Sequence, residues 1–221
     1  MRFSIPCVLL CGGRSTRMGQ LKQDLLIGNA NVPKKQETLA NFQARHLQQW
    51  FLSLYFSAKF EIPNTFGIAT ILDLSLNADN AGKDFNQKIH LADARDWHKI
   101  PKSKFAPIFG LQSILEFLQC DVFVISIDTP FLDCDSIAML WRAYTKNPKP
   151  TFAKNTKIHP LLGIYTLESL AKIKVQIAKG DYKLMRLLEN INAQFVEIDE
   201  DKTLNLNTLE DYQKACKQME S

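Results

Sequence analysis

The chain has 221 residues, of which 46% are hydrophobic and 23% charged, with a formal net charge of +4 at pH 7. A disordered chain would be poorer in apolar residues and more highly charged, and nine Gly and nine Pro exclude a collagen-like or low-complexity chain. The length allows one large domain or two small ones, and the small positive charge does not by itself indicate nucleic acid.

The apolar runs and the cysteines indicate in which compartment the protein works. No run of about 18 apolar residues exists, so we expect no membrane span. The first apolar run stops at Gly12, far short of a secretory signal peptide. The five cysteines are odd in number and lack CxxC spacing, which argues against a disulfide framework or a zinc site. We therefore expect a cytoplasmic protein that contacts neither membrane nor nucleic acid.

Strand-like and helical patterns alternate along the chain. Runs rich in Val, Ile, Leu and Phe predict strands at residues 5–11, 51–58, 67–73 and 121–127, with weaker ones near 160–165 and 194–199. Helical periodicity fills the intervals at residues 37–50, 107–119 and 134–147. This alternation predicts an α/β fold whose parallel or mostly parallel sheet is covered by helices on both faces.

Two polar segments interrupt this alternation. Residues 77–105 are rich in Lys and Asp and poorly periodic, which predicts an inserted surface segment, and residues 146–159 suggest another loop. Neither indicates an interdomain linker, so we expect one domain over residues 1–221. Near the end, Asn207 with Glu210 three positions later is a capping-box pattern, which predicts a helix over residues 208–219.

The strongest local feature is an apolar strand that ends in a Gly pair, followed by a cationic loop. It reads Leu10-Cys11-Gly12-Gly13-Arg14-Ser15-Thr16-Arg17-Met18-Gly19-Gln20-Leu21-Lys22. Glycines let backbone N–H groups approach a phosphate, and Arg17 and Lys22 could neutralise further phosphate charge. The spacing fits neither a Walker A loop nor a dinucleotide fingerprint. The alternative interpretation is a plain glycine turn with solvated cations.

A carboxylate follows the most apolar strand, in the run Ser126-Ile127-Asp128-Thr129-Pro130-Phe131. The carboxyl end of a strand is the ligand edge of an open α/β sheet, where Asp128 could bind Mg²⁺. An Asx turn before a helix is an equally open interpretation of Asp128. The lone His159 is more often structural than catalytic. The absence of HExxH and GxSxG motifs argues against a zinc or triad hydrolase.

Together these segments resemble the MobA family, the molybdenum cofactor guanylyltransferases. The first motif resembles the signature L-x-G-G-x-S-x-R-M-G-x-D-K. Further segments follow in family order and resemble G-P-L-A-G, C-D-T-P-F/Y, H-P-T/L and N-x-N-T-P-E-D/E: residues 106–110, 127–131, 159–161 and 205–211. The resemblance thus spans nearly the whole chain.

The resemblance implies a Rossmann-like, doubly wound fold of the nucleotide-diphospho-sugar transferase type. It implies transfer of GMP from Mg-GTP to the phosphate of molybdenum–molybdopterin, with release of pyrophosphate. The expected nucleotide-binding residues are Leu10, Cys11, Gly12, Gly13, Lys22, Asp93 and Asp128. Arg17, Lys22 and Asp128 would be catalytic, with Asp128 on Mg²⁺. The acceptor side would include Asn205, Asn207 and Lys183.

The chain departs from the family pattern at several positions. Leu21 stands where the family has Asp before the lysine, so Lys34 or Lys35 is an alternative to Lys22. Ser57-Ala58-Lys59 occupies a stretch where family members often have Asn. The family's upstream Asp has no unique match in residues 77–105, where Asp93 and Asp96 are the candidates.

Other functions stay open at this point. Related cytidylyltransferases usually have Ala at the position of Gly12, which favours guanine over cytosine. Nucleotidyl transfer to a sugar or polyol phosphate is a further alternative. A non-catalytic maturation protein is another, although Arg17 and Asp128 argue against it. Whether the chain is an enzyme of cofactor synthesis or a maturation protein, we expect transient contact with proteins of molybdopterin synthesis or molybdoenzyme maturation.

Overall fold

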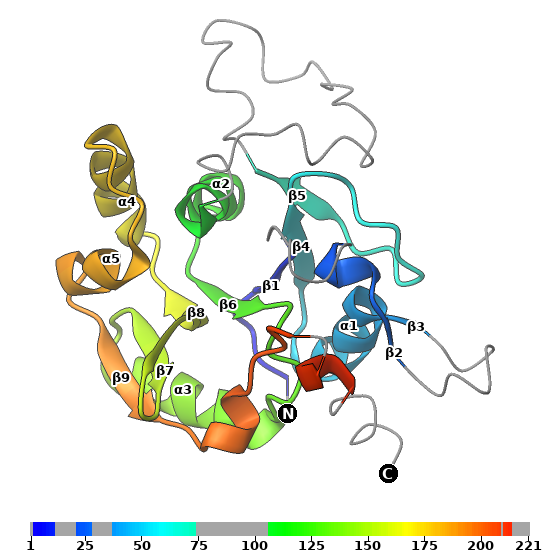
Figure 1. Cartoon of the computed structure of the whole chain (residues 1–221). Helices are drawn as coiled ribbons and strands as arrows, with labels where there is room; N and C mark the ends of the chain where they lie inside the picture. Colours follow the sequence, from blue (N-terminus) through cyan, green and yellow to red (C-terminus); the bar gives the residue numbers. More distant parts are fainter. Residues whose placement is uncertain (1, 12–20, 28–36, 74–105, 209, 214–221) are drawn as a thin grey trace, which may run out of the picture.

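The computed structural model describes residues 2–11, 21–27, 37–73, 106–208 and 210–213 (Figure 1). The strands are β1 (Cys7–Leu10), β2 (Leu26–Ile27), β3 (Glu37–Thr38), β4 (Leu54–Ala58), β5 (Thr70–Leu72), β6 (Val122–Ser126), β7 (Thr151–Lys154), β8 (Ile158–Tyr165) and β9 (Gln194–Glu197). The α-helices are α1 (Leu39–Trp50), α2 (Pro107–Leu118), α3 (Cys134–Lys146), α4 (Ser169–Ala178) and α5 (Leu184–Asn190). Two short 3₁₀ helices are η1 (Lys22–Asp24) and η7 (Glu200–Thr203).

The described strands form a main sheet in the order β5-β4-β1-β6-β8-β7-β9, and β2 pairs with β3 separately. Strands β5, β4, β1 and β6 run parallel to one another, β8 is antiparallel to both β6 and β7, and β9 is parallel to β7. The mostly parallel α/β sheet that the alternation predicts is therefore confirmed. None of the described helices is long and apolar enough to cross a membrane.

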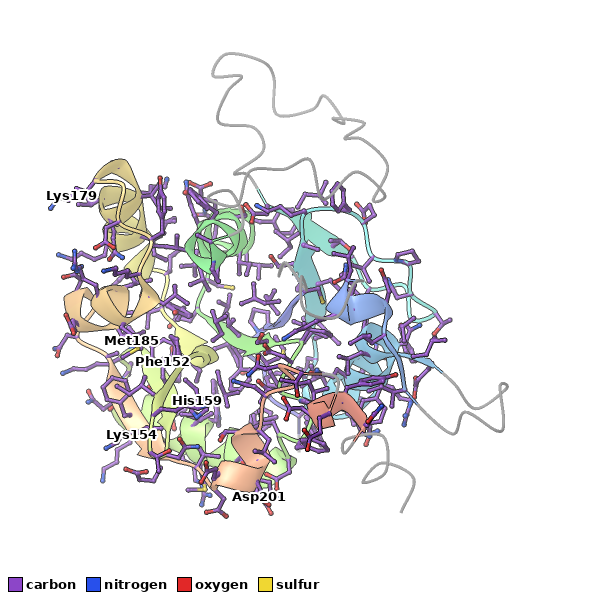
Figure 2. The ribbon with its side chains drawn as sticks, viewed as in Figure 1. Phe152, Lys154, His159, Lys179, Met185 and Asp201 are labelled. Atoms are coloured by element: carbon purple, nitrogen blue, oxygen red, sulfur yellow. The ribbon has the colours of Figure 1, made fainter. Side chains whose placement is uncertain are left out.

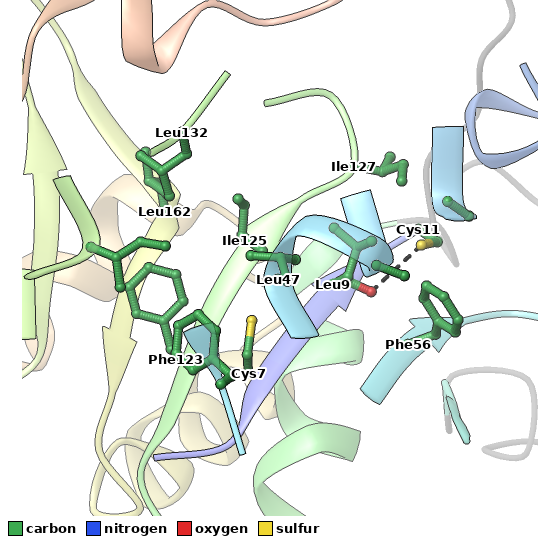
Figure 3. Close-up of a cluster of buried hydrophobic side chains, with 14 of the residues drawn as sticks. Cys7, Leu9, Cys11, Leu47, Phe56, Phe123, Ile125, Ile127, Leu132 and Leu162 are labelled. Carbon is green, nitrogen blue, oxygen red and sulfur yellow. Dashed lines mark hydrogen bonds between the residues drawn. The ribbon is translucent and has the colours of Figure 1, made fainter. Parts of the chain in front are cut away.

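The two faces of the sheet bury separate hydrophobic clusters because strand side chains alternate. Cys7 and Leu9 of β1 point into one cluster with α1 and α3, part of which Figure 3 shows. Val8 and Leu10 point into the other, with α2, α4 and α5. Helices thus cover both faces, and β1 is buried on both sides near the middle of the sheet (Figure 1).

Most predicted elements are confirmed to within a few residues, but the loop predicted at 146–159 is wrong. Thr151–Lys154 form β7, which pairs with β8 and β9, and Phe152 is fully buried. Pro148, Pro150 and several lysines favour a loop, whereas the four-residue strand is held by pairing with the next strand, β8, and with the distant β9. The predicted insertion at 77–105 lies outside the described residues.

The predicted cap of the last helix is displaced by one residue. The Asp211 amide donates to Thr208 Oγ1 at 3.1 Å, and the Thr208 amide donates back to Asp211 Oδ2 at 2.9 Å. This reciprocal pair is a capping box on Thr208 instead of Asn207. The described helical residues are 210–213, and the rest of the predicted helix lies outside the described residues.

Candidate active site

The carboxyl ends of three parallel strands meet at one edge of the sheet. Leu10 of β1 is in register with Ser57 of β4 on one side and Ser126 of β6 on the other. Beyond the strands, the Cys11 amide donates to the Ser57 carbonyl at 2.8 Å and the Ile127 amide to the Leu10 carbonyl at 2.9 Å. The first motif and the Asp128 turn therefore leave the sheet side by side, at the edge where α/β folds bind ligands.

Lys22 and Asp128 form an ion pair at this edge. Lys22 Nζ lies 3.1 Å from Asp128 Oδ2, and their side chains are 15% and 22% exposed. Lys22 opens η1, and the segment that follows is tied to α1 by a 2.7 Å hydrogen bond from the Leu39 amide to the Leu25 carbonyl. The structure thus brings together two predicted site residues that are 106 positions apart.

The Asp128 turn is fixed from three other directions. The Leu206 amide donates to the Asp128 carbonyl at 2.8 Å, and the buried Gln43 side chain on α1 donates to the Ile127 carbonyl. Thr129 Oγ1 donates to Asn205 Oδ1 at 3.0 Å. These bonds fix the backbone of the turn that carries the Asp128 carboxylate, and they place Asn205 beside Thr129.

The other predicted acceptor-side residues are not at this turn. The exposed Asn207 donates its amide to Asp211 Oδ2 at 3.1 Å, so its described role is in the helix cap. Lys183 is exposed at the start of α5, on the face of the sheet that α2 and α4 cover. Its backbone amide donates to Asp181 Oδ1 at 3.1 Å, a local hydrogen bond in the turn that precedes α5.

A second charge pair at the same edge was missed by sequence reasoning. Lys59 follows β4 and Asp73 follows β5, and Lys59 Nζ lies 2.7 Å from Asp73 Oδ2. Both side chains are buried, at 3% and 9% exposure. The available signal was their position, since Lys59 directly follows the predicted strand 51–58 and Asp73 is the last residue of the predicted strand 67–73. The family resemblance points instead to Asp93, which lies outside the described residues.

The described cysteines and histidines at or near the site do not resemble a nucleophile or general base. Burial, together with the charge of Asp24, raises the pKa of the Cys11 thiol well above its usual range. His159 lies on β8 (Figure 2), where its Nε2 is 3.2 Å from Asn155 Oδ1. Burial, together with the charge of Lys157, lowers the pKa of His159. This arrangement fits the structural role that the sequence favours for His159.

The chemistry of the donors fits a nucleotide-bound magnesium ion better than a protein-held cluster. Among the described residues no group of three or more His, Cys, Asp or Glu side chains could hold a metal. Mg²⁺ usually keeps several waters and binds through one or two carboxylates plus substrate phosphates, a role that Asp128 can fill. The remaining predicted site residues lie outside the described residues: Gly12, Gly13, Arg17, Lys34, Lys35 and Asp93.

Comparison with known proteins places these features in a family. A protein from Campylobacter jejuni subsp. jejuni serotype O:6 named molybdenum cofactor guanylyltransferase is 30% identical over 214 residues, covering 95% of this chain and 94% of the relative. A Helicobacter pylori (strain G27) protein of the same name is 28% identical over 218 residues, covering 96% of this chain and 92% of its own.

Solved structures share the fold at low sequence identity. The Archaeoglobus fulgidus molybdopterin-guanine dinucleotide biosynthesis protein A has a TM-score of 0.70 at 16% identity, covering 97% of this chain and 98% of its own. The Thermus thermophilus 2-C-methyl-D-erythritol 4-phosphate cytidylyltransferase has a TM-score of 0.62 at 12% identity, with 99% of each chain covered. The family model described as the MobA-like NTP transferase domain matches residues 7–196. This chain therefore belongs to the MobA-like NTP transferase family.

Proposed function

We propose that this chain transfers GMP from GTP to the phosphate of molybdenum–molybdopterin, releasing pyrophosphate. The observation that carries the proposal is the Lys22–Asp128 pair at the sheet edge beside the end of β1, on a turn whose Thr129 is bonded to Asn205. It is supported by relatives that align over nearly the whole chain and are named molybdenum cofactor guanylyltransferase.

The residues suit an attack by a group that is already an anion. The acceptor phosphate oxygen bonds to the α-phosphorus of GTP while the bond from that phosphorus to the bridging oxygen breaks, so no strong general base is needed. The barrier comes from bringing two anions together in line with the leaving pyrophosphate. Lys22, with Arg17, would neutralise triphosphate charge, and the Asn205 amide would donate to the acceptor phosphate.

Asp128 is the residue that would hold Mg²⁺. When bound, the ion neutralises charge on the triphosphate and on the leaving pyrophosphate. The Asp128 carboxylate is suited to this role because its backbone is fixed by Leu206 and its turn by Gln43. A carboxylate on a fixed turn loses little freedom when it binds a ligand.

The nucleoside end of GTP would lie toward β4 and β5. Neighbouring strands are about 4.8 Å apart, so the ends of β6 and β4 are roughly 10 Å apart across β1, a span that fits a nucleotide. Leu10, Ser57 and Asp73 all approach Gly110 of α2: a Cβ there would lie 3.4, 3.5 and 3.9 Å from their nearest side-chain atoms. We therefore add Asp73 to the candidate nucleotide-binding residues.

Nucleotide selectivity tests the proposal. Pyrophosphate release is measured with molybdenum–molybdopterin and GTP, CTP or ATP in the presence of Mg²⁺. GTP is expected to be the preferred donor, and a preference for CTP would refute guanylyl transfer. Asp128→Asn should abolish Mg²⁺-dependent turnover with its folded state retained by circular dichroism, whereas Asp201→Asn, at a carboxylate 67% exposed, should behave as wild type. Turnover unchanged in Asp128→Asn would refute the metal role.

A further inference from the structure

The Lys59–Asp73 pair is a buried charge pair in which Lys59 has no role in the chemistry above. Its side chains are 3% and 9% exposed, and Lys and Asp are almost never buried to this extent unless they are paired. Desolvation offsets most of the attraction in such pairs, and replacing both partners by apolar groups is often neutral or stabilising. Stability alone therefore gives a weak reason for two charges at this position.

The pair sits where the proposed nucleoside would bind. The Asp73 amide donates to the Ala58 carbonyl at 3.0 Å, so the ends of β4 and β5 run together. Ile71 of β5 lies in the hydrophobic cluster on the α2 face, and side chains alternate, so Asp73 points to that same face. Gly110 agrees with this placement, because a Cβ there would lie 3.9 Å from Asp73 Oδ2 and 3.4 Å from a methyl carbon of Leu10.

The chemistry of the pair favours recognition of hydrogen-bond donors. A carboxylate offers about four lone-pair sites on two oxygens, so Asp73 can accept from Lys59 and from a ligand at the same time. A 2.7 Å bond to a buried ammonium group fixes the rotation of the carboxylate. Such an acceptor discriminates strongly, because a ligand that lacks the matching donor leaves a buried polar group unpaired.

Resting on the guanylyltransferase function proposed above, we propose that Lys59 is a positioning residue that aims the Asp73 carboxylate at a donor of the bound nucleoside. Two groups of GTP have this chemistry: the 2-amino group of guanine and the 2′-hydroxyl of ribose. Lys59 itself acts through Asp73, because its ammonium group is bound to that carboxylate at 2.7 Å.

Equilibrium binding to the full-length protein tests this role. The dissociation constants of GTP, ITP and 2′-deoxy-GTP are measured by calorimetry with Mg²⁺ and without acceptor, so that no turnover interferes. ITP lacks the 2-amino group and 2′-deoxy-GTP lacks the 2′-hydroxyl, so the two analogues separate the two donors. The variants are Lys59→Met, Asp73→Asn and the double variant. Lys154→Met is the matched control, because Lys154 pairs with Glu197 on the surface at 44% and 72% exposure.

Lys59→Met is expected to weaken GTP binding by about tenfold or more and to remove the preference for GTP over one of the two analogues. The double variant should be no worse than Asp73→Asn alone, because Lys59 acts through Asp73. Lys59→Arg, which keeps the charge, should restore part of the preference. Lys154→Met should match the wild type.

Two results would overturn the inference. One is an unchanged preference for GTP over both analogues in Lys59→Met; the other is an equal loss of affinity for all three nucleotides, which a structural role alone predicts. If Lys59→Met does not fold, Lys59→Gln takes its place, with the same ratios deciding. Failure of the wild type to bind GTP would refute the proposed function instead, so the two failures are distinguishable.

Discussion

Replacing Lys22 by Met separates its role in the chemistry from its role in stability. Lys22 Nζ and Asp128 Oδ2 are 3.1 Å apart, where two unit charges attract by about 5 kcal/mol at an effective dielectric constant of about 20. Desolvation opposes most of this, and both side chains retain some contact with water, which leaves a net contribution of about 1–2 kcal/mol. For a chain of this size that corresponds to a fall in Tm of roughly 2–8 °C.

The effect on turnover should be much larger than the effect on stability. A cation that stabilises developing charge in a site of this kind contributes about 2.7–4 kcal/mol to the transition state, which is a loss of about 10²–10³-fold in kcat when it is removed. The Met side chain keeps most of the length of the Lys22 stem, so the loss reports the charge more than the packing. Lys22→Arg should retain more activity than Lys22→Met.

The assay is pyrophosphate release from GTP under saturating acceptor, with Tm measured by calorimetry on the same preparations. Lys174→Met is the matched control, because Lys174 pairs with Glu116 on the surface at 52% exposure and should change neither quantity. Lys35→Met tests the competing assignment for the triphosphate lysine. Wild-type turnover in Lys22→Met with a strong loss in Lys35→Met would refute the assignment of Lys22 to the triphosphate.

Three further predictions concern stability. Gly163→Ala should lower the free energy of unfolding in urea by about 3 kcal/mol or more, because the added Cβ would lie 2.2 Å from a β7 backbone oxygen. Gly180→Ala, at φ of +70° with nothing within 4 Å, should lower it by only about 1 kcal/mol. Equal losses in the two variants would contradict the clash at Gly163. The pKa of His46 is lowered by burial and by the charge of Arg45, so its contribution to stability is present above its unfolded pKa, about 6.5, and is lost as pH falls through its folded pKa. His46→Gln should therefore flatten the fall in unfolding free energy between about pH 7.5 and 5.5. An unchanged slope would count against this role of His46. Asp133→Ala should cost about 1 kcal/mol in the same assay, because Asp133 caps α3 at 2.9 Å; no measurable cost would show that the cap is dispensable.

Local patterns in the sequence predict much of the sheet because its central strands are buried on both faces. The uninterrupted apolar run of β6 and the apolar end of β1 mark such strands without any tertiary information. Strand β7 was not predictable in this way. It has only four residues and follows two prolines, and its position in the sheet depends on pairing with the distant β9 as well as with the adjacent β8.

The sequence predicts individual residues of the candidate site but not the contacts between them. Asp128 and Lys22 could each be proposed from position and motif, but their direct contact depends on how η1 packs against α1. Lys59 and Asp73 carry no local motif, since a Lys or Asp after a strand is ordinary. Only the register of β4 with β5 brings them within 2.7 Å and buries them.

The described residues at this edge supply fixed charges more readily than a nucleophile. The buried thiols of Cys7 and Cys11 have pKa values raised by desolvation, so both stay neutral near pH 7. The two lysines, in contrast, are each held by a carboxylate, at 3.1 Å for Lys22 and 2.7 Å for Lys59. Charges whose positions are set during folding need little reorganisation when a reaction develops charge beside them. A transfer between two anions, limited by repulsion and alignment, gains most from that arrangement, and it needs no activated side-chain nucleophile.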